Sequence, residues 1–240
     1  MAATGANQSP LLCTHALEAF YGDAQALFGI DFTLEQGEVV AIIGANGAGK
    51  STFLKCLTGL LRAPREAVRL AGEAVGGLPP GEIVRRGLAL VPEGRRLFPS
   101  LSVQENLLMG SCSRRSGPWD LQRLYRLFPV LQDKRHAPAT SLSGGQQQMA
   151  ALGRALMSNP RVLLCDELSL GLAPIVIGEI YRALPQVTAE GMTVVIVEQD
   201  VGLAQRVSRR LYCLQEGRVS LQGRSDSFTR EQVSQAYFGA

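Results

Sequence analysis

The stretch VVAIIGANGAGKST, Val39 to Thr52, decides the fold. It opens with an apolar run, Val39 to Gly44, typical of a parallel strand buried on both faces. A glycine-rich turn follows, and a helix is expected from Thr52 to Leu61. Glycines let successive backbone N–H groups turn inward around a phosphate, and the N-terminus of the helix favours an anion. The stretch therefore predicts a phosphate-binding loop between a strand and a helix.

Each polar residue of this loop has an expected role. Lys50 is expected to reach the β- and γ-phosphates of a nucleoside triphosphate, and the Ser51 hydroxyl to bind Mg²⁺. A glycine-rich turn without function is the alternative, but the flanking strand and helix disfavour it. The predicted nucleotide-binding residues of the loop are Gly44, Ala45, Asn46, Gly47, Ala48, Gly49, Lys50, Ser51 and Thr52.

A second buried strand, in RVLLCDE (Arg161 to Glu167), ends in two carboxylates. Asp166, at the end of the strand, suits a water-mediated ligand of Mg²⁺. Glu167 points elsewhere and is expected to polarise an attacking water. Two acids after an apolar strand are often only the start of a loop, but here they follow a phosphate loop. A pair that positions water indicates a hydrolase rather than a kinase.

The third motif is LSGGQQQ, Leu142 to Gln148, which opens another helix. Ser143 is a good N-cap, and the two glycines after it leave the first-turn amides uncovered. Alone it is a flexible turn; placed between the other two motifs, it resembles the signature of ATP-binding-cassette (ABC) transporter ATPases. The resemblance covers Leu12 to Gly239. It implies that ATP held on a partner subunit is contacted by Ser143, Gly144, Gly145 and Gln146.

The resemblance also implies the architecture. It is an α/β fold with a RecA-like core that carries the phosphate loop, an N-terminal antiparallel β subdomain and a helical insertion. The predicted core spans about 11–95 and 160–240, the helical subdomain about 96–158, and residues 1–10 form a disordered lead-in. Tyr21 falls where the family stacks an aromatic ring on adenine, although alone it is an ordinary strand tyrosine.

Periodicity gives the individual elements. Ser102 and Glu105 form a capping-box pattern that opens a helix, and Pro185 is expected to end or kink the helix after Pro174. A closing hairpin turns at Glu216-Gly217. The other strand-like segments are Leu12–Phe20, Phe28–Leu34, Ala67–Ala71, Leu88–Pro92 and Thr193–Val197.

Composition sets outer limits. The chain has 240 residues, 46% of them hydrophobic, which is enough for one domain with a full core. A net charge of +3 is too small and too scattered for a nucleic-acid binder, and pairs such as Arg95-Arg96 and Arg209-Arg210 are expected to be solvated. The five cysteines are isolated, and no apolar run approaches the ~18 residues of a membrane span. We therefore expect a cytosolic protein with reduced thiols.

Two positions depart from the common pattern of the family. Glu93 stands where most members have a glutamine that touches Mg²⁺, and Gln199 where most have a histidine that contacts the γ-phosphate. Together with VPEGRRLFPSLSVQENL (91–107), VEQD, SLGLAP and QAYFG, these departures resemble one branch, the second ATPase of branched-chain amino acid importers. The predicted metal ligands are thus Ser51, Glu93 and Asp166, and the predicted catalytic residues Glu167 and Gln199. Alternatively, Glu93 points to solvent.

That branch implies partners and a location. The implied partners are two membrane permeases, a second and different ABC ATPase (or a second copy of this chain), and indirectly a substrate-binding protein. The location is the cytoplasmic face of a bacterial inner membrane. An importer of urea or short-chain amides is the alternative, although its ATPases tend to have glutamine at position 93. Soluble ABC ATPases of DNA repair or ribosomes usually carry long coiled coils or two cassettes, and a phosphate-loop kinase or GTPase does not explain LSGGQ.

Gln199 leads to a hypothesis of functional asymmetry. A glutamine can offer the γ-phosphate a neutral amide donor but never a cationic one. Losing a well-placed donor to a transition state costs about 2.7–4 kcal/mol in other hydrolases, and a weaker substitute should cost less. The phosphate loop of this chain would then serve a slower site, while its Ser143, Gly144 and Gly145 complete the site of the partner.

Overall fold

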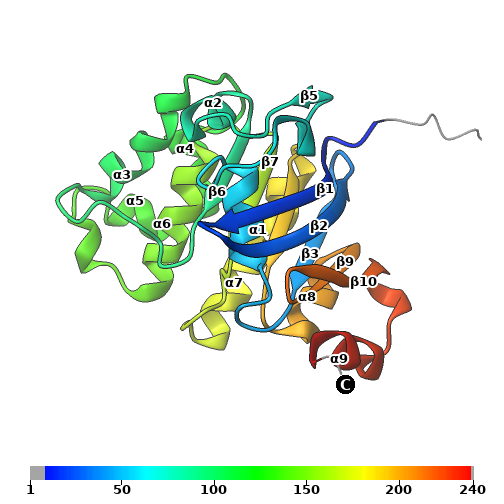
Figure 1. The fold of residues 1–240 in the computed structure, drawn as a ribbon. Helices are drawn as coiled ribbons and strands as arrows, with labels where there is room; N and C mark the ends of the chain where they lie inside the picture. The colour runs from blue at the N-terminus through cyan, green and yellow to red at the C-terminus, as the bar shows by residue number, and fades with distance from the viewer. Residues whose placement is uncertain (1–8, 239–240) are drawn as a thin grey trace, which may run out of the picture.

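The computed structural model describes residues 9–238, in two sheets flanked by helices (Figure 1). Most of the predicted lead-in, residues 1–8, lies outside the described residues, as do Gly239 and Ala240. The central sheet has six strands in the order β10-β9-β3-β8-β7-β6. Their bounds are β3 Val39–Ile43, β6 Leu88–Val91, β7 Val162–Asp166, β8 Thr193–Val197, β9 Arg210–Gln215 and β10 Arg218–Arg224.

Five of these strands run parallel, and only β10 is antiparallel to its neighbour β9. Strand β3 lies between β8 and β9, and Ile42 pairs with Val197, which itself pairs with Asp166 on β7. All residues of β7 and β8 are buried, as the continuous apolar runs predict. Because the strands are parallel, their carboxyl ends meet at one edge of the sheet.

The second sheet is antiparallel, with the order β2-β1-β4-β5. Its strands are β1 Leu12–Tyr21, β2 Ala24–Leu34, β4 Val68–Leu70 and β5 Glu73–Ala74. Phe32 of β2 joins the two sheets: its ring centroid lies 5.3 Å from Phe53 of helix α1 and 4.9 Å from Tyr212 of β9. Strand β2 begins four residues before the predicted start, and the two-residue strand β5 is not predicted.

Helix α1 spans Lys50–Leu57, so the predicted range from Thr52 to Leu61 is shifted. The helix starts directly on the phosphate loop, with Gly49 as its N-cap. It ends before Gly59, whose φ of +72° is left-handed. A Cβ at Gly59 would lie 2.2 Å from the Leu78 carbonyl oxygen, so a tertiary contact sets this end of the helix.

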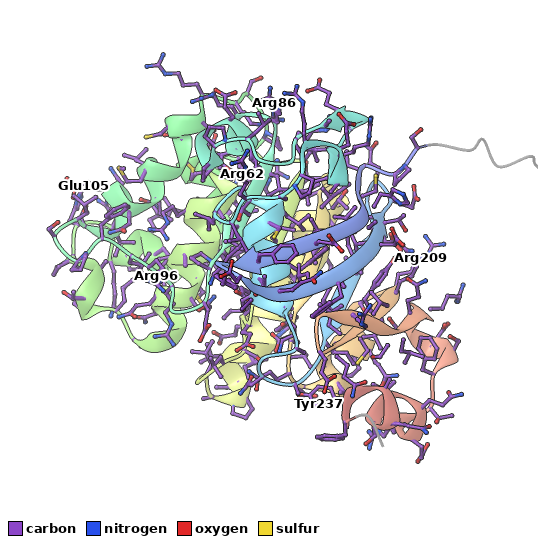
Figure 2. The ribbon with its side chains drawn as sticks, viewed as in Figure 1. Arg62, Arg86, Arg96, Glu105, Arg209 and Tyr237 are labelled. Atoms are coloured by element: carbon purple, nitrogen blue, oxygen red, sulfur yellow. The ribbon has the colours of Figure 1, made fainter. Side chains whose placement is uncertain are left out.

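Helices α3, α4, α5 and α6 gather on one side of the molecule, away from α9 (Figure 1). Figure 2 labels Glu105 on α3, far from Tyr237 on α9. The capping box of Ser102 and Glu105 is confirmed at the start of α3. The bounds of the remaining helices are α2 Pro80–Arg85, α3 Val103–Met109, α4 Leu121–Leu127, α5 Pro129–Asp133, α6 Gly144–Leu156, α7 Pro174–Ala189, α8 Val201–Val207 and α9 Arg230–Phe238.

Two expectations are corrected. Helix α7 does not end at Pro185 but continues to Ala189, because its apolar face, including the fully buried Val187, packs into the core beyond the proline. Arg210 is not simply solvated: its guanidinium binds the buried carboxylate of Glu38 at 2.6 and 2.9 Å. Within residues 9–238, no helix combines the length and the apolar character that a membrane crossing requires.

Candidate functional site

The candidate site lies at the carboxyl edge of the central sheet. Gly44 follows β3, Glu93 follows β6 after one proline, Asp166 ends β7 and Gln199 follows β8. The sheet order brings these four segments together although they are far apart in the chain. They meet around an open cavity of about 420 Å³, lined by Asn46, Gly47, Gly49, Lys50, Ser51, Thr52, Glu93, Glu167, Leu170 and Gln199.

The phosphate loop is held from behind by the β9–β10 hairpin. Gly217, at the turn of the hairpin, donates its N–H to the Ala48 carbonyl at 3.0 Å. Gly44 has a φ of +149°, and a Cβ there would lie 2.3 Å from the Leu214 carbonyl oxygen. Only glycine fits this close approach. The loop thus depends on a hairpin about 170 residues later in the chain.

Lys50 points into the loop and is only 5% exposed. Its Nζ donates hydrogen bonds to the carbonyl oxygens of Gly44 at 2.7 Å and Ala45 at 3.1 Å, and lies 3.9 Å from Glu167 Oε1. Burial lowers the pKa of Lys50, while the Glu167 and Asp166 carboxylates act in the opposite direction. A buried ammonium at this position suits an anionic ligand in the loop.

Glu167 and Gln199 contact each other directly. Gln199 Nε2 donates to both carboxylate oxygens of Glu167, at 2.8 and 2.9 Å. Glu167 has a left-handed backbone, with φ at +50°, and its N–H donates to the Val197 carbonyl at 3.0 Å. That strained turn aims the carboxylate across the edge of the sheet toward Gln199 and Lys50. The two predicted catalytic residues therefore form one pair.

Asp166 is a buried carboxyl with an unsatisfied oxygen. Its Oδ1 has no hydrogen-bond partner among residues 9–238. Burial, together with the Glu167 and Glu93 carboxylates, raises the pKa of Asp166 to about 6, although a hydrogen bond from Ser51 and the charge of Lys50 act in the opposite direction. Mg²⁺ prefers carboxylate, hydroxyl and phosphate oxygens and keeps several waters, so these groups fit it. No set of three or more Asp, Glu, His or Cys side chains in the described chain is arranged to hold a metal unaided.

Glu93 is exposed, yet it lines the same cavity as Lys50 and Glu167. Its charge contributes to the raised pKa of Asp166, so a third carboxylate does lie near the pair, as the sequence predicts. Tyr21 is 47% exposed beside the start of α1, with its hydroxyl 3.4 Å from Thr52 Oγ1 and from Lys55 Nζ. An open ring at the margin of the loop is compatible with the predicted stacking on adenine.

The signature residues lie elsewhere. Ser143 caps α6 in a capping box with Gln146, which confirms the predicted N-cap. Gly145 packs inward, since a Cβ there would lie 2.3 Å from Val176 Cγ1 of α7, whereas at Gly144 the nearest atom is an Arg95 guanidinium nitrogen at 3.3 Å. Within residues 9–238, neither these glycines nor their cap lines the phosphate-loop cavity.

Two features of the site are not apparent from the sequence. Arg95, expected to be solvated, is half-buried and donates to Gln147 Oε1 at 3.3 Å. Arg154 of α6 in turn donates to the carbonyl oxygens of Arg95 and Arg96, on the loop between β6 and α3. The loop that carries Glu93 is thereby fastened to the signature helix. Arg95 and Arg96 both have a left-handed φ, which the residue type arginine does not predict.

The second missed feature is Glu198, which is 1% exposed between Val197 and Gln199. Its carboxylate accepts hydrogen bonds from Ser169 N at 3.2 Å, Ser169 Oγ at 2.6 Å and the Tyr181 hydroxyl. The position of Glu198 directly after a buried strand is a signal in the sequence that marks it as a candidate site residue. The sequence does not show its hydrogen-bond partners, because they come from other segments.

Comparisons with known proteins identify the family. The sequence model of the ABC transporter family matches residues 27–169. The chain is 42% identical over 232 residues to the high-affinity branched-chain amino acid transport ATP-binding protein BraG of Pseudomonas aeruginosa, covering 95% of this chain and 100% of that protein. It is 34% identical to the glutamine transport ATP-binding protein GlnQ of Escherichia coli, over 90% and 92% of the two chains.

Solved structures agree. The ATP-binding subunit of an ABC transporter superposes with a TM-score of 0.83 at 26% identity, covering 95% of this chain and 98% of that one. The dimeric structure of a bacterial ABC transporter cassette superposes with a TM-score of 0.79 at 25% identity, over 90% and 100%. The fold is thus the predicted α/β ABC ATPase fold. The chain belongs to the ABC transporter family and is an ATP-binding subunit that hydrolyses ATP to drive transport.

Proposed function

We propose that this chain energises the uptake of branched-chain amino acids as one ATPase subunit of an importer. The observation that carries the catalytic part is the contact of Gln199 with both oxygens of Glu167, beside Lys50 and the phosphate loop. The substrate class is supported by the identity of 42% with BraG along nearly the whole chain, and by the Glu93 and Gln199 departures. The substrate itself is selected by other chains of the transporter.

In this proposal Glu167 is the general base. Lys50 leaves its carbonyl partners to bind the β- and γ-phosphates of ATP, and the loop amides surround them. The Glu167 carboxylate then accepts a proton from the water that attacks the γ-phosphate. Gln199 holds that carboxylate in place and offers its amide to the γ-phosphate. Ser51, Asp166 and Glu93 would hold Mg²⁺, which would supply positive charge to neutralise the phosphate oxygens.

The proposal extends to the assembly. Ser143, Gly144, Gly145 and Gln146 complete the nucleotide site of a partner ATPase, since they lie outside the loop cavity of this chain. The partner is a second, different ABC ATPase or another copy of this chain. Two membrane permeases hold the pair at the cytoplasmic face of a bacterial inner membrane, and a substrate-binding protein supplies the amino acid. The core of this chain spans about 11–95 and 160–240, and its helical subdomain about 96–158.

ATP turnover tests the catalytic part. We expect the assembled transporter to release phosphate from ATP. The Glu167→Gln variant of this chain should bind ATP normally, but the rate of ATP hydrolysis in its own site should fall at least about 100-fold. Uptake of labelled leucine, isoleucine and valine, compared with urea and acetamide, tests the substrate class in the same vesicles. Full turnover by Glu167→Gln would contradict the role of Glu167 as the base. Uptake of urea alone would contradict the proposed substrate class.

Assay of the chain without partners separates two forms of the assembly. Turnover by the isolated chain that Glu167→Gln abolishes would mean that two copies form working sites and that Gln199 substitutes adequately for histidine. Binding of ATP without turnover would mean that the chain requires its different partner.

A further inference from the structure

Glu198 is a buried carboxylate that no cation neutralises. None of the ion pairs formed by the described residues includes it, although it is 1% exposed. Burying a charge without an opposite charge is costly, and the hydrogen bonds of Ser169 and Tyr181 offset only part of that cost. Burial raises the pKa of Glu198, and the hydrogen bonds from Ser169 and Tyr181 act in the opposite direction. The cost suggests that the carboxylate serves the site rather than the fold.

The bonds of Glu198 reach two catalytic segments. Its own N–H donates to the Ile42 carbonyl at 3.1 Å, so its backbone is fixed to β3 directly before the phosphate loop. Gln199 is the next residue. The side chain of Glu198 meanwhile holds Ser169, two residues after Glu167, through both the backbone N–H and the hydroxyl.

These contacts close a ring. Glu198 is covalently linked to Gln199, Gln199 donates to both oxygens of Glu167, and the chain runs from Glu167 to Ser169, which returns to Glu198. Tyr181 anchors the ring to α7. If the link between Ser169 and Glu198 breaks, the turn at Glu167 and the turn at Gln199 lose the hydrogen bonds that join them on the buried side.

We propose that Glu198 is a positioning residue for ATP hydrolysis, which holds the Glu167 turn and the Gln199 turn at the separation that their pairing requires. It does not line the phosphate-loop cavity and acts through Ser169. A displacement of about 1 Å in a reacting group can cost on the order of 100-fold in rate. The inference rests on the proposed role of Glu167 as the base.

Two variants in the assembled transporter test the proposal. Ser169→Ala removes the hydroxyl that binds Glu198. Glu198→Gln keeps the shape but exchanges one acceptor oxygen for a donor nitrogen and removes the buried charge. We expect both to lower kcat for ATP about 10–100-fold while KM for ATP changes less than about threefold, because the phosphate loop is untouched. Thermal unfolding should show Glu198→Gln to be as stable as the unmodified chain or more so.

Ser158→Ala is the matched control. Ser158 is a buried serine, whereas Ser169 is half-buried, and the Ser158 hydroxyl donates to the Ala155 carbonyl of α6 at 2.7 Å, outside the loop cavity. We expect it to lose stability comparably to Ser169→Ala but to keep its kcat. If Ser169→Ala and Glu198→Gln keep kcat, or lose it only in proportion to a loss of stability that Ser158→Ala shares, Glu198 is a structural residue and the proposal is wrong.

Glu167→Gln, measured alongside, separates this failure from that of the proposed base. If Glu167→Gln retains turnover, the role of Glu167 is wrong and Glu198 has nothing to position. If Glu167→Gln is inactive while Ser169→Ala and Glu198→Gln are fully active, only the role of Glu198 is wrong.

Discussion

At the scale of the residue, the site contains ionisable side chains whose charged forms are disfavoured by their surroundings. Asp166 has a raised pKa because it is buried beside Glu167 and Glu93, and burial lowers the pKa of Lys50. Neither group is in its most stable environment without a ligand. The residues that we propose to bind phosphate and metal are therefore a source of instability in the protein without ligands, which bound nucleotide and metal would relieve.

The raised pKa of Asp166 predicts a pH dependence of stability. Its pKa rises from 3.8 when unfolded to about 6 when folded, so the folded chain binds more protons between these values. The stability that this group contributes is fully present below pH 4 and is lost as the pH rises through about 6. At about 1.36 kcal/mol per pKa unit, the loss is about 1–3 kcal/mol.

Urea unfolding of the nucleotide-free chain at pH 4.5 and pH 7.5 measures this loss. In Asp166→Asn the free energy of unfolding should change less between the two pH values, by the same amount, because the asparagine amide does not titrate. An identical pH dependence in both proteins would contradict the raised pKa.

Gln199 gives a second prediction at this scale. Gln199→His introduces a side chain that can carry a positive charge opposite Glu167. Under the asymmetry hypothesis we expect ATP turnover by the assembled complex to rise several-fold, because the slower site gains a cationic donor. Phosphate release measured with the corresponding glutamate of the partner ATPase changed to glutamine isolates this site. Unchanged turnover would remove the main support for functional asymmetry.

At the scale of the element, helix α6 shows how one motif serves two purposes. Its capping box, formed by Ser143 and Gln146, is determined by adjacent residues. Its two glycines differ: Gly145 has no side chain because α7 approaches, whereas Gly144 faces only the flexible end of Arg95. We infer that Gly145 is needed to pack this chain and Gly144 to admit the nucleotide of a partner.

The two glycines form a matched pair of variants. Gly145→Ala forces a methyl group against Val176 and should destabilise the chain by about 1–3 kcal/mol in urea unfolding. Gly144→Ala should change the free energy of unfolding by less than about 0.5 kcal/mol, yet lower ATP turnover in the complex. Equal loss of stability in both would show that α7 does not distinguish the positions.

At the scale of the whole molecule, aromatic packing joins the two sheets to the phosphate-loop helix. Phe32 contacts Phe53 of α1 and Tyr212 of β9, so one side chain of the antiparallel sheet supports both the loop helix and the central sheet. Damage to this contact should therefore reach the site without touching it.

Phe32→Ala should cost about 3–5 kcal/mol of unfolding free energy, because the ring is 2% exposed. It should also weaken ATP binding, since α1 loses its support. Phe20→Ala is the control: Phe20 lies on the neighbouring strand but is 46% exposed, and we expect it to cost less than about 1 kcal/mol. Comparable losses from both would mean that Phe32 does not join the sheets.

The sequence by itself determined the local chemistry. The strand, glycine turn and lysine of the phosphate loop, the acids after β7 and the caps of α3 and α6 each depend on neighbours within a few residues. Backbone conformation and side-chain periodicity are short-range properties, so they can be read from the chain. The three motifs in order were also enough to identify the ABC transporter family.

Only the tertiary structure decided which of these pieces meet. The order β3-β8-β7 brings Gln199 to Glu167, the β9–β10 hairpin sets the need for Gly44, and α7 sets the need for Gly145. The brace from Glu198 to Ser169 and the fastening of the Arg95 loop to Arg154 arise in the same way. Such contacts join residues about 30 to 170 positions apart, and the order of parallel strands that creates them is set by packing of the whole core, which local patterns do not encode.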